Sequence, residues 1–209
     1  MHFILPYFII LIIILQFAIK RSFRNHKSRN QQFLERESRA NQVRRKDISN
    51  LNYISIPDNL PLINSGNETF NQLLSNNSGM MRSYNTITGL KDKKILNLTG
   101  ISNTELKLSY GAANLTELTE YDDNFTTLIK AIASLGHALI DNNDTADALS
   151  FLEYGISIGS DISSNYIDLA IIYAATDRFD DIRKLKEKAG MLKSLSRDNI
   201  IEQLNNMLK

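Results

Sequence analysis

The feature that most constrains this chain is its first nineteen residues, an apolar run without a formally charged side chain. Its polar members are His2 and Gln16. As a helix at about 1.5 Å per residue, residues 1–19 would span roughly 28 Å, close to the bilayer hydrocarbon core of about 30 Å. The run therefore predicts a transmembrane helix.

Two alternatives to an anchor are a cleaved signal peptide and a buried helix of a soluble protein. A signal peptide needs a basic segment before the apolar run and small residues at a cleavage site. No Lys or Arg precedes the run, and Phe17, Ala18 and Ile19 lead directly into Lys20. Length and flanks favour the uncleaved single-pass anchor.

Residues 20–46 form a basic juxtamembrane segment with ten Lys or Arg against Glu35 and Glu37, a net charge of +8. Positive flanks stay cytoplasmic, which predicts a plasma-membrane protein with its amino terminus outside and its carboxyl-terminal domain in the cytoplasm. The segment either only stops translocation or also contacts anionic lipid, at about 1 kcal/mol per basic residue. Nucleic acid is not expected, because no stacking aromatics or reading motif accompany the charge.

Residues 47–209 carry a net charge of −7 and change character twice. Residues 47–100 are expected to be an extended or loop-rich linker, with a short helix near 68–74. Within this linker Tyr53–Leu62 alternates apolar side chains and contains two prolines, which favour extended backbone. Ser102 followed by Glu105 is a capping-box pattern that starts a short helix ending near Gly111.

Residues 101–209 are expected to be a helical domain, which makes the predicted fold class all-α. Apolar residues recur at helical spacing, and polar runs such as Asp141–Asp144 interrupt them. Helices are predicted over residues 125–140, 145–158, 162–174 and 179–192, with a last helix from about residue 196.

A shift of 34 residues superposes two of the predicted hairpins. The superposed pairs are Leu135 with Leu169, Gly136 with Ala170, Leu139 with Tyr173, Ala148 with Ile182 and Gly155 with Ala189. The spacing is typical of the tetratricopeptide repeat (TPR), in which small residues let the two helices approach closely. It predicts repeats at about 129–162 and 163–196 and a capping helix at 196–209. Leu139, Ile182 and Lys186 depart from the repeat's usual residue types.

Several segments resemble uncharacterised membrane-anchored tetratricopeptide proteins of Gram-positive bacteria. They are residues 93–100 (KKILNLTG), 102–108 (SNTELKL) with Tyr110-Gly111, 118–122 (LTEYD) and 153–163 (EYGISIGSDIS). The resemblance covers about residues 91–209 and implies a bacterial plasma-membrane location. It implies no known activity, so it assigns no catalytic residue.

The sequence contains no catalytic constellation. Cysteine is absent, which excludes thiolate metal sites and a thiol nucleophile. His137 has only Asp141 as a metal partner at helical spacing, and two ligands do not make a site. Residues 155–159 match Gly-X-Ser-X-Gly, but a helix precedes them and no His follows. Residues 141–147 resemble a calcium loop but are expected to cap a helix. No cofactor or metal is predicted, and the chain is not expected to be an enzyme.

The leading functional hypothesis is a membrane-tethered adaptor or scaffold whose cytoplasmic repeats bind a protein or peptide segment. The alternative is an accessory or assembly subunit of a membrane-bound enzyme complex, and an enzyme of unseen type is a third, weaker hypothesis. Outward positions on the first helix of each hairpin are the expected partner-binding residues: Lys130, Ala133, His137, Ile140, Ser164, Ile167, Ile171 and Ala174. Five of these eight are apolar, and either a foreign partner or the chain's own Tyr53–Leu62 is expected to cover them.

Overall fold

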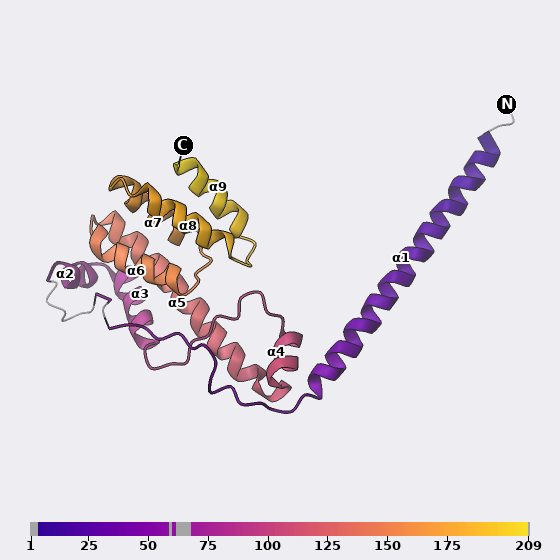
Figure 1. The fold of residues 1–209 in the computed structure, drawn as a ribbon, viewed down its shortest axis with the longest axis horizontal. Helices are drawn as coiled ribbons and strands as arrows, with labels where there is room; N and C mark the ends of the chain where they lie inside the picture. Colours follow the sequence, from indigo (N-terminus) through magenta and orange to yellow (C-terminus); the bar gives the residue numbers. More distant parts are fainter. Residues whose placement is uncertain (1–3, 59, 62–67, 209) are drawn as a thin grey trace. The chain divides into compact units, whose positions relative to one another are not determined.

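The computed structural model describes residues 4–58, 60–61 and 68–208, and only the backbone of residues 4–10 and 22–27. Within these ranges the chain is helical and has no strand, which confirms the all-α prediction (Figure 1). The helices are α1 (Ile4–Asn41), α2 (Glu68–Asn76), α3 (Ser78–Gly89), α4 (Asn103–Tyr110), α5 (Leu115–Asp141), α6 (Thr145–Ser157), α7 (Ser163–Ala175), α8 (Phe179–Gly190) and α9 (Arg197–Met207), with a 3-10 turn η1 (Ala112–Asn114).

These elements divide into two compact units. The first comprises Met1–Asp47 and Ser102–Leu115, and the second comprises Ile48–Ile101 and Thr116–Lys209. Residues 102–115, which the sequence analysis places in the helical domain, are thus grouped with the amino-terminal helix. Helix α5 begins at the last residue of the first unit and continues in the second.

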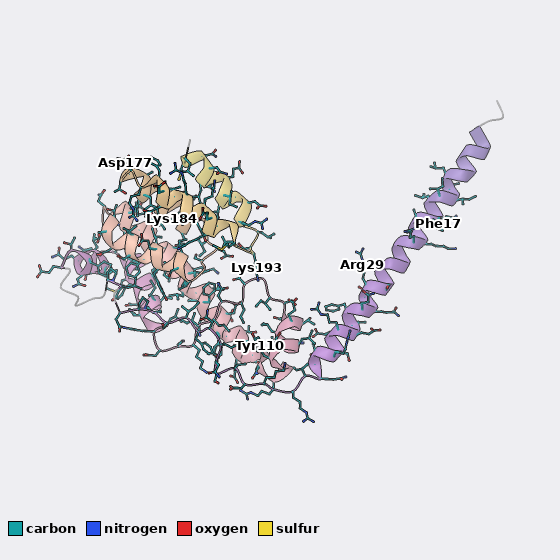
Figure 2. The ribbon with its side chains drawn as sticks, viewed as in Figure 1. Phe17, Arg29, Tyr110, Asp177, Lys184 and Lys193 are labelled. Atoms are coloured by element: carbon teal, nitrogen blue, oxygen red, sulfur yellow. The ribbon has the colours of Figure 1, made fainter. Side chains whose placement is uncertain are left out.

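Helix α1 is one uninterrupted helix of 38 residues, and Figure 1 shows it as straight. At 1.5 Å per residue it is about 57 Å long. Every side chain from Leu11 to Arg21 is exposed, and Figure 2 shows Phe17 projecting outward. The anchor predicted over residues 1–19 includes residues 1–3, which lie outside the described residues. In the described part of the chain, no helix combines the length and the hydropathy that crossing a membrane requires.

The carboxyl-terminal part of α1 pairs with α4 through polar contacts. The Glu37 carboxylate accepts a hydrogen bond from the Thr104 hydroxyl at 2.7 Å and forms an ion pair with Lys107. At the start of α4, the Ser102 hydroxyl accepts from the Glu105 amide at 3.3 Å, and the Glu105 carboxylate accepts from the Ser102 amide at 2.9 Å. The predicted capping box is therefore confirmed.

Gly111 ends α4 at a close backbone crossing within the first unit. Its φ of 93° lies in the left-handed region, and a Cβ atom there would sit 2.3 Å from the carbonyl oxygen of Arg44. Asn114 is fully buried beside it and donates to the carbonyl oxygens of Lys46 and Tyr110 at 2.7 and 2.8 Å. The predicted role of Gly111 as a helix terminator is confirmed, and the crossing adds a second reason for glycine.

In the second unit, α5 and α6 form a hairpin through reciprocal small-residue contacts. A Cβ atom on Gly136 would lie 2.6 Å from the Leu152 side chain, and one on Gly155 would lie 3.0 Å from that of Ile132. Helix α6 packs on α7, α7 packs on α8, and α9 packs against both α7 and α8. The hairpins thus stack in chain order, with α9 last.

The helices predicted for the carboxyl-terminal part are present, and their register is consistent with the 34-residue shift. All ten residues that the shift superposes are buried. The predicted and observed bounds of α6, α7 and α8 differ by at most two residues, whereas α5 begins ten residues before the predicted start at Phe125. Small residues therefore lie where helices meet, as the pattern requires.

The prediction of an extended or loop-rich linker at residues 47–100 is only partly correct. The expected short helix is α2, but α3 was not expected. Phe70 of α2 and Tyr84 of α3 meet edge to face with ring centroids 5.7 Å apart, and Phe70 also stacks on Phe151 of α6. Asn77 caps α3, since its side chain accepts from the amides of Gly79 and Met80. This range is therefore part of the core of the second unit.

Candidate protein-binding faces

The eight predicted partner-binding residues lie on α5 and α7 of the second unit, and we call them the α5/α7 face. Lys130, His137, Ser164 and Ile171 are exposed. Ile140, Ile167 and Ala174 are half-buried. Ala133 is only 5% exposed, so little of its side chain is open to a partner. Ile171 is the largest exposed apolar side chain of the set, at 48%.

A shallow hollow joins the amino-terminal half of this face. Its volume is about 330 Å³. Its lining comprises Lys130, Ala133, Ser134, His137, Ile162 and Ser164. The structure thus brings together four of the eight predicted residues from α5 and α7, which are not consecutive in the chain.

His137 is the polar centre of the α5/α7 face. Its Nδ1 lies 3.0 Å from Oδ2 of Asp168 on α7, and its Nε2 lies 3.8 Å from Oδ2 of Asp141 on its own helix. The Asp168 side chain is 10% exposed, whereas that of Asp141 is 66% exposed. The imidazole therefore connects α5 with α7, the first helices of the two hairpins. The exposed carboxylate of Asp141 lies on its other side.

Burial raises the pKa of the Asp168 carboxyl above its ordinary value of 3.8. The charge of His137 and its hydrogen bond act in the opposite direction, and the carboxylate of Asp141 adds to the rise. Removing a carboxylate from water disfavours its charged form, which explains the sign. Sequence analysis missed Asp168; the available signal was the only acid of α7, which lies between Ile167 and Leu169 in the apolar part of the helix.

The segment around Tyr53–Leu62 docks on the chain itself, but not on the α5/α7 face. The amide of Ile54 donates to the carbonyl of Ile95 at 2.9 Å, and the Tyr154 hydroxyl of α6 donates to the carbonyl of Ser55 at 3.2 Å. Ile56 and Leu60 are buried in a small pocket with Tyr84, Ile87 and Phe151. Asn59 and Leu62 lie outside the described residues. The described part of the segment thus covers α3 and α6, and leaves Ile171 exposed.

The two sequence motifs that resemble chemical sites, residues 155–159 and residues 141–147, both lie at helix ends. Gly159 adopts a left-handed φ of 87° after α6, and the amide of Ser160 donates to the carbonyl of Gly155 at 3.0 Å. Asp144 caps α6, and its carboxylate accepts from the amide of Asp147 at 3.4 Å. The predicted capping role of residues 141–147 is confirmed. Among the described residues, no cluster of three His, Asp or Glu side chains is placed to hold a metal ion.

No protein-family model, no curated protein and no solved structure matches this chain. The resemblance to membrane-anchored tetratricopeptide proteins therefore stays a prediction.

Proposed function

We propose that this protein is a membrane-tethered interaction module, anchored by the amino-terminal part of α1 and carrying tetratricopeptide-like hairpins in the cytoplasm. The α5/α7 face binds a short protein segment in this proposal. The observation that carries it is Ile171, which remains 48% exposed beside the hydrogen-bonded Asp168 and His137 after the chain's own extended segment has docked elsewhere. An exposed apolar side chain next to ordered polar groups is typical of a binding surface.

The charges on this face indicate the chemistry of the bound segment. Asp141 and Asp168 lie on either side of His137, and the carboxylate of Asp141 is exposed. A cationic side chain in the ligand would meet the exposed Asp141 carboxylate, and an apolar one would cover Ile171. We therefore assign the face to a segment that carries a Lys or Arg next to an apolar residue.

Support for the tether comes from α1. Leu11, Ile13, Ile14, Leu15 and Phe17 are each at least 58% exposed. A helix that is apolar all round is stable only when something apolar surrounds it, and a bilayer provides such surroundings. Lys20 and Arg21 follow directly, as at the cytoplasmic end of an anchor. These two residues place positive charge within reach of anionic headgroups.

Photo-crosslinking tests the proposed face. A benzophenone amino acid at position 171 should give a discrete adduct in membranes, and the same probe at exposed Glu187 of α8 should not. Asp141→Arg should reduce the adduct, because it places a cation where the ligand's cation binds. Equal labelling from both positions, or an adduct that is insensitive to Asp141→Arg, would contradict the assignment. An adduct with a subunit of a stable detergent-resistant enzyme complex would favour the accessory-subunit alternative.

A further inference from the structure

A second, larger groove lies on the other helices of the stack, and we call it the α6/α8 groove. Its walls are residues 52–55, residues 96–101 and the carboxyl-terminal ends of α6 and α8, and its volume is about 690 Å³. Leu96, Ile156 and Tyr166 are buried in its floor. All of these residues belong to the second unit. The groove was not expected from the sequence, because its walls come from four separate segments.

The rim of this groove is apolar and exposed. Met191 is 73% exposed and Ile101 is 41% exposed, and both line the groove. The Asn97 side chain closes one end, since its amide donates to the carbonyls of Ile158 and Gly159 at 3.4 Å each. Asn52 and Ser55 are exposed on the opposite wall and supply polar groups beside the apolar floor. Such a lining suits an extended peptide, which needs apolar contacts and backbone hydrogen bonds together.

The charge at the groove is opposite to that of its surroundings. Residues 47–209 have a net charge of −7, yet the charged residues that line the groove are Lys188, Lys193 and Asp161. Within the described part of the chain, neither lysine forms an ion pair. Lys188 lies in the last turn of α8, where the helix dipole favours a cation. That explanation does not apply to Lys193, which follows the helix (Figure 2).

The stem of Lys193 is held against the opposite wall. A Cβ atom on Gly100 would lie 3.1 Å from the Cβ of Lys193 and 3.4 Å from its Cδ. The stem thus lies along the 96–101 wall at Gly100, and Lys193 as a whole is exposed. A carboxylate in the groove would meet the ammonium group of this lysine without rearrangement of its stem, which lowers the entropic cost of binding.

We propose that the α6/α8 groove is a second binding site, for an extended peptide that carries apolar side chains beside carboxylates. The apolar floor and rim bind the apolar side chains of the peptide, and Lys188 and Lys193 bind its carboxylates. The two faces of the second unit then select oppositely charged segments. This inference is independent of the ligand assigned to the α5/α7 face.

A defined probe tests the proposal with the full chain in detergent micelles. The probe is a fluorescent octapeptide of alternating Asp and Leu, and its reference is the octapeptide of alternating Lys and Leu. The acidic probe should bind more tightly than the reference, and its affinity should fall with added salt. Lys188→Glu with Lys193→Glu should weaken it by at least about tenfold. The control is Arg82→Glu with Lys93→Glu, which changes the net charge equally at exposed positions outside both faces and should have a smaller effect.

A second variant tests the apolar rim. Ile101→Ser with Met191→Ser alters two exposed side chains without changing the charge, so the fold should be retained, and the acidic probe should again bind at least about tenfold more weakly. Absence of binding to the unmodified chain would overturn the proposal. So would equal affinity for the two octapeptides, or equal losses in the groove variant and the charge-matched control. Crosslinking from position 171 tests the α5/α7 face by a separate experiment, so failure of one proposal can be told from failure of the other.

Discussion

Gly155 of α6 faces Asn165 of α7 so closely that a Cβ atom on the glycine would lie 2.3 Å from Nδ2 of the asparagine. Asn165 is fully buried, and neither of its side-chain polar atoms has a hydrogen-bond partner. A buried amide without partners is costly. This contact therefore joins the two hairpins through one glycine and one unsatisfied polar side chain.

Gly155→Ala should destabilise the chain by about 1–3 kcal/mol, because the new methyl group overpacks the contact. Asn165→Ala should partly restore stability in the double variant, since it removes the obstructing amide. Alone, Asn165→Ala should change stability by less than about 1 kcal/mol, because lost packing and a removed unsatisfied group act in opposite directions. Urea unfolding of the four proteins measures the cycle. Additive effects of the two changes would contradict the contact.

Ala170→Leu tests the 34-residue register. Ala170 is fully buried in α7, so the larger side chain should cost about 1–3 kcal/mol. Ala175→Leu at the exposed end of the same helix is the matched control and should be nearly neutral. Equal melting temperatures for the two variants would mean that position 170 is not a close-approach position.

Gly111→Ala should disrupt the first unit specifically. The added Cβ would meet the Arg44 carbonyl, which is backbone and cannot turn aside, and the left-handed φ adds strain. Hydrogen exchange should therefore show lost protection in α4, with unchanged protection in α7. Gly190→Ala, where nothing lies within 4 Å of the new methyl group, is the control. Retained protection of α4 in Gly111→Ala would contradict the crossing.

The raised pKa of Asp168 gives a pH dependence with a definite sign. Because the folded chain holds this proton more tightly than the unfolded chain, stability falls as pH rises from the ordinary value of 3.8 through the raised value. Asp168→Asn should therefore stabilise the protein near neutral pH, and this gain should vanish below about pH 3.8. Unfolding free energies of both proteins at several pH values measure the difference. A gain that grows as pH falls would contradict the sign.

The elements that the sequence predicted well are those with local signals. Ser102 and Glu105 are three residues apart, and the polar run at Asp141–Asp144 lies between two apolar periodicities, so both helix boundaries were predictable. Helix α3 was missed because Asn, Ser, Thr and Gly lower its helix propensity. Its buried Met80, Tyr84 and Ile87 do have helical spacing, and this was the available signal.

The sites were less predictable, because their contacts join distant parts of the chain. Asp168 lies 31 residues from His137, and Ser55 lies 99 residues from Tyr154. The alternation in Tyr53–Leu62 indicated an extended docked segment but not the helices that it covers. The α6/α8 groove depends on four segments whose proximity only the packed structure reveals.

The central claim is that α1 tethers a cytoplasmic binding unit to a membrane. The chain contains no cysteine, so single cysteines report location cleanly. In intact cells, a membrane-impermeant maleimide should label His2→Cys but not Glu187→Cys. Glu187→Cys should be labelled only after the membrane is permeabilised, because position 187 is exposed on α8. Labelling of Glu187→Cys in intact cells would contradict the proposed topology, and release of the whole chain from membranes by an alkaline wash would contradict the tether.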